Sequence, residues 1–370
     1  MASVLASLRR RWERLTLRLA LLALSAVAGV IAIAQPAPPP EKTTFKVAWS
    51  VSVGGMPWDY AQSSGILRKW ADKYGITIQL VQVNDYIDAI NRYTAGAFDA
   101  CAMTNMDMLT IPSAGGVDST ALIVGDYSNG NDGIVLKGAG RKLADIKGQT
   151  VNLTELSVSH YLLARALASV GLKERDVTIV NTPDEEIVGS FAAPRAVATV
   201  AWKPQLASVM ASPRATLVFD SSQIPGEILD LMVVNSKVLK DNPRLGKALV
   251  GAWYETLAVL QRNDASATGA LEAMGKAFGT DAKGFSQQLA TVHLYLTPPS
   301  GVAAVTSAEL LARTDRVRQF SFDHGLLGAA AKSVDAVGIQ FPGGRTLGSP
   351  KNIKMRFDSS YMKLAMDGKL

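Results

Sequence analysis

Strand-like and helix-like segments alternate along most of the chain, and this order limits the fold more than any other feature. Residues 45–50 have the apolar character of a strand, and residues 59–74 have a helical spacing of apolar side chains that stops at Gly75. Residues 76–83 then alternate apolar and polar, and residues 85–95 again predict a helix. This βαβ order predicts an α/β fold with mostly parallel sheets and helices on both faces.

The alternation begins again near residue 134, which indicates a second α/β unit over residues 134–225. Residues 150–153 predict a strand, and either Ser157 or Ser159 is placed to cap the helix that follows. Residues 229–234 predict a further strand, which could return to the first sheet.

The chain is mostly helical in its predicted pattern after residue 235. Apolar residues recur at helical spacing over residues 243–261, 265–278 and 282–294. Thr306 and Glu309 have the spacing of a capping box, which predicts a helix that continues to about residue 325.

The first 34 residues have the features of a cleavable export signal. Five arginines precede an apolar stretch, residues 19–34, which ends in Ala-Ile-Ala. This stretch is short for a membrane span, although a retained anchor is the alternative. Residues 35–44 contain four prolines and predict an extended tether. We therefore expect a periplasmic protein, and the sequence leaves open whether the general secretory route or the twin-arginine route exports it.

The net charge does not indicate a nucleic-acid partner. The whole chain has a formal charge of +6, but the predicted signal peptide contains five arginines and Glu13. Without that segment, 33 basic and 31 acidic residues remain, a net charge of +2. The basic character therefore belongs mostly to the export signal.

The sequence also argues against most enzyme classes. Cys101 is the single cysteine, which excludes an internal disulfide or a multi-cysteine metal site. The three histidines form neither an HExxH nor a His-x-His pair, and there is no phosphate-binding glycine loop, nucleophile elbow or EF-hand loop. We therefore predict no catalytic residue, no cofactor and no metal ligand, and expect a binding protein rather than an enzyme.

Three segments, in this order and spacing, resemble a known family. Residues 96–107 contain Gly-Ala-Phe-Asp-Ala followed by Met-Thr-Asn-Met-Asp. Residues 143–172 contain Leu-Ala-Asp-Ile-Lys-Gly and then Ser-His-Tyr-Leu-Leu, and residues 197–204 end in Ala-Trp-Lys-Pro. They are similar to the periplasmic substrate-binding proteins of ABC importers, in the nitrate/sulfonate/taurine group. One departure is Arg195, which stands where that group has an aspartate before its tryptophan segment.

This resemblance implies a two-lobed periplasmic-binding-protein fold with C-terminal helices. Residues 45–133 would begin lobe 1, residues 134–225 would form lobe 2, and residues 226–370 would return to lobe 1. The lobes would close on a ligand by a hinge motion. The protein would be a monomer, and its closed form would dock on an ABC permease in the inner membrane. Residues 104–107 and 126–132 further resemble the urea-carboxylase-associated branch, whose members handle guanidine or a related nitrogen compound.

Ligands of open α/β folds bind at the carboxyl ends of strands, so the candidate site consists of residues that follow predicted strands. The predicted ligand-binding residues are Trp58, Thr104, Asn105, Asp107, Asp132, Glu155, Ser157 and Trp202. Helix N-termini at such an edge favour anions. The side chains favour a cation, because they include several carboxylates and Lys203 is the one basic residue near these strand ends.

Guanidinium suits such a site because it pairs with carboxylates through several N–H donors and can lie against an indole ring. Urea would instead use the mixed donors and acceptors of Thr104, Asn105 and Ser157. Binding of sulfonate, taurine or nitrate is the alternative, and a pyrimidine-precursor-synthase-like enzyme of the same fold or a periplasmic sensor are others. Asp107 and Trp202 also have ordinary structural roles open to them, as a helix cap and as a core residue.

Overall fold

The computed structural model describes Trp12 and residues 41–370. Apart from Trp12, the predicted signal peptide lies outside the described residues, as do residues 35–40 of the predicted tether. Within the described part of the chain, no helix combines the length and the apolar character needed to cross a bilayer.

Two separate sheets organise residues 43–370. The described part of the first sheet has nine strands in the order β13-β12-β14-β4-β10-β3-β1-β2, with β11 paired to β4. These strands are β1 (Thr44–Trp49), β2 (Thr77–Gln82), β3 (Ala100–Thr104), β4 (Ser119–Ser128), β10 (Leu229–Asn235), β11 (Val292–Leu294), β12 (Gly338–Gln340), β13 (Thr346–Leu347) and β14 (Ile353–Phe357). The second sheet has the order β7-β6-β8-β5-β9. Its strands are β5 (Asp132–Lys137), β6 (Thr150–Leu153), β7 (Thr178–Asn181), β8 (Ala198–Trp202) and β9 (Ala215–Asp220).

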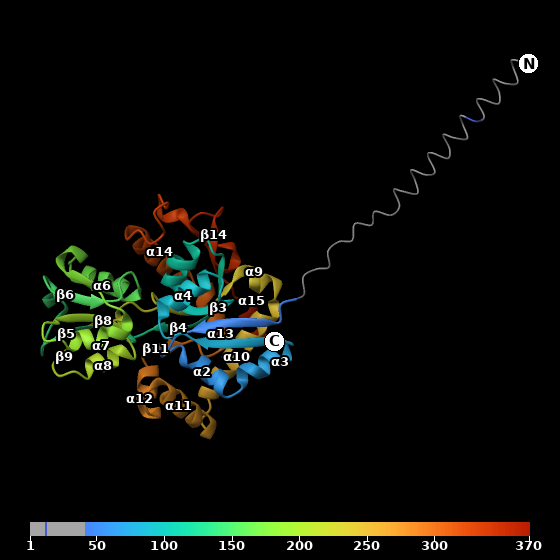
Figure 1. Cartoon of the computed structure of the whole chain (residues 1–370), viewed down its shortest axis with the longest axis horizontal. Helices are drawn as coiled ribbons and strands as arrows, with labels where there is room; N and C mark the ends of the chain where they lie inside the picture. The colour runs from blue at the N-terminus through green and yellow to red at the C-terminus, as the bar shows by residue number, and fades with distance from the viewer. Residues whose placement is uncertain (1–11, 13–40) are drawn as a thin grey trace, which may run out of the picture. The chain divides into compact units, whose positions relative to one another are not determined.

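Helices accompany both sheets. With the first sheet are α2 (Met56–Ser63), α3 (Ile66–Lys73), α4 (Tyr86–Thr94), α5 (Asn105–Met108), α9 (Ser236–Asp241), α10 (Pro243–Leu260), α11 (Ala265–Phe278), α12 (Ala282–Leu289), α13 (Pro298–Thr306), α14 (Ala308–Asp323) and α15 (Ser360–Met366). With the second are α6 (Val158–Ser169), α7 (Ile187–Ala192) and α8 (Gln205–Met210). In Figure 1 the green elements β5 to β9 and α6 to α8 lie together, beside the remaining elements. The α/β, two-lobed fold predicted from the sequence is confirmed.

The sheets are mixed, which corrects the expectation that they are mostly parallel. β10 pairs antiparallel with both β3 and β4, and β5 pairs antiparallel with both β8 and β9. β4 runs toward the second lobe, and β10 begins where the chain returns from it. A strand that enters the first sheet at that edge must run opposite to the strands that end there.

Three predicted helices differ in detail. The predicted helix over residues 59–74 is two helices, α2 and α3, because Gly65 lies between them with a left-handed φ of 81°. The predicted helix over residues 282–294 ends at Leu289, and the segment after it pairs with β4 as β11. The cap of α14 is Ser307, whose Oγ accepts from the Leu310 N–H, because Thr306 still belongs to α13.

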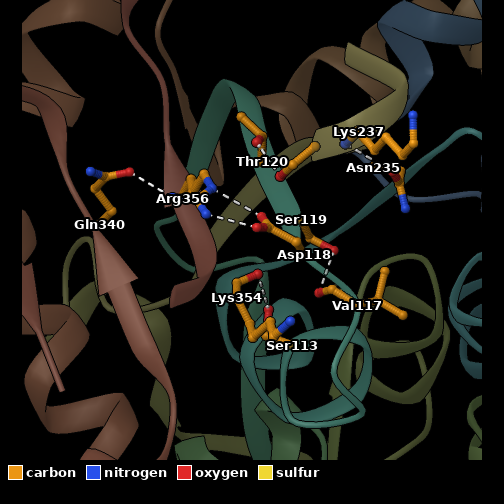
Figure 2. A network of polar contacts seen from close by, with 11 residues as sticks. Ser113, Val117, Asp118, Ser119, Thr120, Asn235, Lys237, Gln340, Lys354 and Arg356 are labelled. Carbon is orange, nitrogen blue, oxygen red and sulfur yellow. Dashed lines mark hydrogen bonds and ion pairs between the residues drawn. The ribbon is translucent and has the colours of Figure 1, made fainter. Parts of the chain in front are cut away.

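The last strands complete the first sheet. β14 pairs parallel with β4, and Arg356 on β14 forms a two-point ion pair with Asp118, with N–O distances of 2.9 and 2.7 Å. The same guanidinium donates to the Gln340 side chain of β12, at 2.7 Å. Figure 2 shows this network, in which Arg356 joins two C-terminal strands to the start of β4. The C-terminal segment is therefore part of the lobe 1 sheet.

Each lobe has its own apolar core, and α14 contributes to both. Leu310, near the start of α14, belongs to the core of the first lobe. Val317 and Phe320, about two turns later, belong to the core of the second lobe. This helix therefore links the lobes, in addition to the two crossovers that join β4 to β5 and β9 to β10.

Candidate functional site

A pocket of about 80 Å³ lies where strand ends from both sheets meet. From the first lobe it is lined by the loop after β1, the ends of β3 and β4 and the start of β10; from the second lobe by the start of β5 and the end of β8. A volume of this size accommodates a few water molecules or one ligand of a few heavy atoms. The polar and charged lining side chains are Ser50, Ser52, Asn84, Thr104, Asp126, Ser128, Asn131, Asp132, Asp184 and Asp230.

Two carboxylates face each other across the antiparallel strands β4 and β10. Asp230 is directly opposite Asp126 on one side and Thr104 on the other, so the three form a row across the sheet. The ladder slips by one residue beside this row, at Gly125, and such bulges re-aim neighbouring side chains. Like charges directly opposite one another are unfavourable. Ionisation of both carboxyl groups would therefore require a positive charge beside them.

The backbone at Gly54 lies close to both carboxyl groups. A Cβ atom at this position would lie 2.2 Å from Asp126 Oδ2 and 2.9 Å from Asp230 Oδ2. A side chain at position 54 would therefore displace the Asp126 carboxyl group and crowd that of Asp230.

The electrostatics of this pair favour a proton or a cation. Asp126 is fully buried, and the only polar group beside its two oxygens among the described residues is the neighbouring Asp230 carboxyl. Burial, together with the charges of Asp230 and Asp132, raises the pKa of Asp126 well above its usual range. Burial and the charge of Asp132 raise the pKa of Asp230 to about 7. A proton held between the two groups, or a cation beside them, would relieve this repulsion.

A third carboxylate, Asp132, comes from the second lobe. Its Oδ2 accepts from the Ser128 hydroxyl, which lies 2.6 Å from the hydroxyl of Ser221, and its Oδ1 is buried without a hydrogen-bond partner. Burial raises the pKa of Asp132 to about 6, against the opposing effect of the Ser128 hydrogen bond. Residues of both lobes thus direct carboxylate oxygens into one pocket.

Aromatic rings form the walls. Trp58 of α2 and Trp253 of α10 lie with their ring centroids 5.0 Å apart, and both line the pocket. Tyr86 of lobe 1 and Trp202 of lobe 2 meet edge to face with centroids 6.1 Å apart. The pocket therefore offers ring faces and carboxylates, and no lysine or arginine lines it among the residues that the structure describes.

The comparisons with known proteins agree with this architecture. Residues 39–273, more than half of the chain, match the NMT1-like family. The chain belongs to the NMT1-like family. No curated protein matches the sequence.

Solved structures resemble this NMT1-like chain in fold. The alkanesulfonate-binding protein SsuA of Xanthomonas axonopodis pv. citri, bound to MOPS, has a TM-score of 0.63 and 17% identity, over 78% of this chain and 95% of SsuA. The periplasmic aliphatic sulphonate binding protein SsuA of Escherichia coli has a TM-score of 0.64 and 17% identity, over 78% of this chain and 94% of that protein. The periplasmic nitrate-binding protein NrtA of Synechocystis PCC 6803 has a TM-score of 0.56 and 13% identity, over 90% of this chain and 100% of NrtA. At these identities the similarity establishes the fold, which is that of periplasmic binding proteins.

The structure brings four of the eight predicted site residues together. Trp58, Thr104, Asp132 and Trp202 all line the pocket. Of these, Asp132 and Trp202 are direct neighbours across the antiparallel strands β5 and β8.

The other four predicted residues do not line the pocket. The Asn105 amide bridges the crossover, because it donates to the Glu227 carbonyl and accepts from the Leu229 N–H. The Ser157 hydroxyl accepts from the Ser159 N–H and caps α6. Glu155 is exposed.

Asp107 acts behind the pocket wall. It is buried, accepts from the Tyr86 hydroxyl at 2.6 Å and from the Thr104 hydroxyl at 2.6 Å, and does not itself line the pocket. Because Tyr86 and Thr104 do line it, Asp107 positions two pocket residues.

Several lining residues were not selected from the sequence. The strand-end pattern includes Asp126 among the carboxylates that favour a cation, but not among the eight predicted ligand-binding residues. It does not indicate Asp184 or Asp230, and Tyr86 and Trp253 have only the pattern of helix residues. The sequence does contain a signal for Asp230, because it is a single carboxylate within the apolar strand Leu229–Asn235. A charge buried in such a strand is costly unless it has a partner.

Proposed function

We propose that this protein is the periplasmic solute-binding component of an ABC importer and that it captures a small cationic nitrogen compound, with guanidinium as the best fit. The observation that carries the proposal is the convergence of Asp126, Asp132 and Asp230 in a pocket without a basic lining residue among those described. A buried cation needs carboxylate partners, and the pocket provides them from both lobes.

The shape of guanidinium suits this arrangement. It is planar, has several N–H donors and no acceptor, and forms paired hydrogen bonds with carboxylates. The carboxylate oxygens of Asp126 and Asp132 that lack partners would accept these donors. The indole faces of Trp58 and Trp202 would add cation–π contacts of about 0.5–2 kcal/mol each.

An anion is the second candidate, because the structurally similar proteins include sulfonate-binding and nitrate-binding proteins. In this pocket a sulfonate or nitrate would meet three buried carboxylates without a compensating lysine or arginine among the described lining residues. Such an anion would have to enter with protons on those groups, which makes it the weaker candidate at neutral pH.

A ligand panel tests the proposal. Thermal shifts and calorimetric titrations at low millimolar concentration would compare guanidinium, methylguanidine, urea, taurine, an alkyl sulfonate and nitrate. We expect saturable one-to-one binding of guanidinium that strengthens as the pH rises from 5.5 to 8, because binding requires ionised carboxylates. Urea is neutral and would show no such gain. Binding of taurine or sulfonate in place of guanidinium would refute the cation proposal.

A matched pair of variants locates the site. Asp230→Asn removes one pocket charge and keeps the side-chain shape, so guanidinium binding should weaken by about 2–5 kcal/mol. Glu155→Gln removes a carboxylate that is exposed and outside the pocket, so affinity should stay within about twofold of the unaltered protein. An equal loss of guanidinium affinity in the two variants would contradict the location of the site in this pocket.

The family and the fold support the transport role. Delivery to a membrane permease would follow closure of the two lobes around the ligand, as a hinge motion. Uptake of labelled guanidinium by the host strain should fall when the gene is deleted and should return with the unaltered gene. Restoration of uptake by the Asp230→Asn variant would contradict the role.

A further inference from the structure

Three side chains that are far apart in the sequence meet outside the pocket. His160 lies in the first turn of α6, Glu174 begins a short 3₁₀ helix (Glu174–Asp176), and His324 is the C-cap of α14. One nitrogen or oxygen atom from each lies within 4.8 Å of the others. None of the three residues lines the pocket.

The distances within the cluster are close to those of a metal-ligand set. His324 Nε2 lies 2.8 Å from both oxygens of Glu174, and His160 Nε2 lies 3.6 Å from Glu174 Oε1. Ligand atoms about 2.0–2.1 Å from a tetrahedral Zn²⁺ are roughly 3.3–3.5 Å apart. A shift of less than about 1 Å in these side chains would therefore fit an ion between them.

His324 is already oriented as a metal ligand. Its Nδ1 lies 2.8 Å from the Phe320 carbonyl oxygen, to which it can donate. Metal-binding histidines commonly donate their other ring N–H to a backbone carbonyl, which leaves the Nε2 lone pair for the ion. Its Nε2 faces the Glu174 carboxylate, so a bound metal ion would take the place of any proton on Nε2.

His160 supplies the second, independent observation. The side chain is only 4% exposed, and its Nε2 is buried with no hydrogen-bond partner, directed toward Glu174. Its Nδ1 accepts from the Leu156 N–H at 3.2 Å, and this contact must be released when Nε2 binds a metal, because Nδ1 then carries the proton. Leu156 is exposed and has a φ of 65°, so a change in this loop would also relieve an unfavourable backbone conformation.

We propose that His160, Glu174 and His324 form a Zn²⁺ site that fastens α14 to the second lobe. Two imidazoles and a carboxylate are ligands that Zn²⁺ prefers, and Glu174 and His324 are open enough to solvent for water to take the fourth position. Since α14 also packs in the core of the first lobe, the ion would join the two lobes on the side of this helix. The sequence gives no sign of this site, because its ligands are not in a short motif.

Calorimetric titration of the chelator-treated protein with ZnCl₂ tests the proposal. We expect one high-affinity site, a rise in the melting temperature with one equivalent of Zn²⁺, and no comparable effect of Mg²⁺. Co²⁺ in place of Zn²⁺ should give the visible absorption of a site with nitrogen ligands. His160→Gln, Glu174→Gln and His324→Gln should each weaken Zn²⁺ binding at least tenfold.

The third histidine of the chain provides the control. His293 stacks on Tyr127 in the first lobe and takes no part in the cluster, so His293→Gln should leave Zn²⁺ affinity unchanged. Asp126→Asn tests whether the acidic pocket accounts for the bound ion. One-to-one Zn²⁺ binding that survives all three cluster substitutions would overturn the proposal. So would the absence of binding, which would leave the cluster as an ion pair only. Guanidinium affinity of the three variants, measured separately, keeps this result independent of the proposed ligand.

Discussion

At the scale of single residues, the pocket carboxylates work against stability in the absence of a ligand. Asp126, Asp132 and Asp230 have pKa values raised in the folded state, chiefly by burial. The folded protein therefore holds more protons than the unfolded chain between about pH 4 and pH 7. Stability should fall as the pH rises through this range, because ionisation of these groups is harder in the folded protein.

The expected loss can be measured by urea unfolding without ligand at pH 5 and pH 8. Asp132 alone, with a pKa of about 6 against a usual 3.8, would contribute on the order of 3 kcal/mol as an upper estimate. Asp230→Asn should flatten this pH dependence, and saturating guanidinium should reverse it. A free energy of unfolding that increases from pH 5 to pH 8 in the unaltered protein would contradict the assignment.

Gly54 gives a second prediction at this scale. In Gly54→Ala the new methyl group would overlap Asp126 Oδ2, so guanidinium affinity should fall at least tenfold while the protein remains folded. Gly189→Ala is the matched control, because its Cβ meets no atom within 4 Å and it lies within helix α7, where alanine adds about 0.5–1 kcal/mol of stability. Titration calorimetry and thermal unfolding of both variants separate the two effects. Unchanged affinity in Gly54→Ala would mean that the ligand does not contact the carboxylate pair.

At the scale of elements, Glu227 joins α6, α14 and the crossover into β10. It is 4% exposed and accepts from Arg165 at 2.8 Å, Arg316 at 3.0 Å and the Tyr161 hydroxyl at 2.5 Å. Glu227→Gln leaves these donors without their charged partner and should cost about 2–4 kcal/mol of unfolding free energy. Arg316→Gln removes a half-exposed partner and should cost less than about 1 kcal/mol.

Urea unfolding of these two variants measures the contrast. Burial is opposed by the hydrogen bonds from Arg165 and Tyr161, which lower the pKa of Glu227 below its usual 4.5. Its contribution is therefore present above about pH 4.5 and is lost as the pH falls further, so the difference between Glu227→Gln and the unaltered protein should shrink at low pH. Equal costs for Glu227→Gln and Arg316→Gln would show that the buried carboxylate does not hold α14 to α6.

Elements also show what local sequence can predict. The cap at Ser157 and the helix stop at Gly75 depend on a few neighbouring residues, and periodicity marks most strands and helices. The direction of β10 and the pairing of β14 with β4 depend on segments more than a hundred residues apart, which a local pattern does not encode.

The same division applies to the site. The rule that ligands bind at the carboxyl ends of strands led to Thr104 and Trp202, because β3 and β8 do end at the pocket. Asp230 lies at the start of its strand, and only the antiparallel course of β10 brings it there. Glu155 follows β6, whose end does not reach the pocket, so the rule selected a residue outside it.

At the scale of the whole molecule, the pocket needs both lobes. Asp126 and Asp230 come from the first sheet, and Asp132 and Trp202 from the second, so neither lobe alone presents the complete set. A cation that contacts carboxylates of both lobes binds the closed arrangement more strongly than an open one, and its binding must favour closure. Saturation at 1,000 times the dissociation constant would add about 4 kcal/mol to the stability of the folded protein.

Closure can be followed by small-angle X-ray scattering, which should give a smaller radius of gyration with guanidinium than without it. Trp202→Ala removes the contact between Tyr86 and the second lobe, so the variant should lose much of this compaction and bind guanidinium more weakly. Met210→Ala is the control, since it removes an apolar side chain of lobe 2 that is 37% exposed and outside the pocket. If the radius of gyration is the same with and without a tightly bound ligand, the lobes are already closed without it, and Trp202 would contribute to affinity alone.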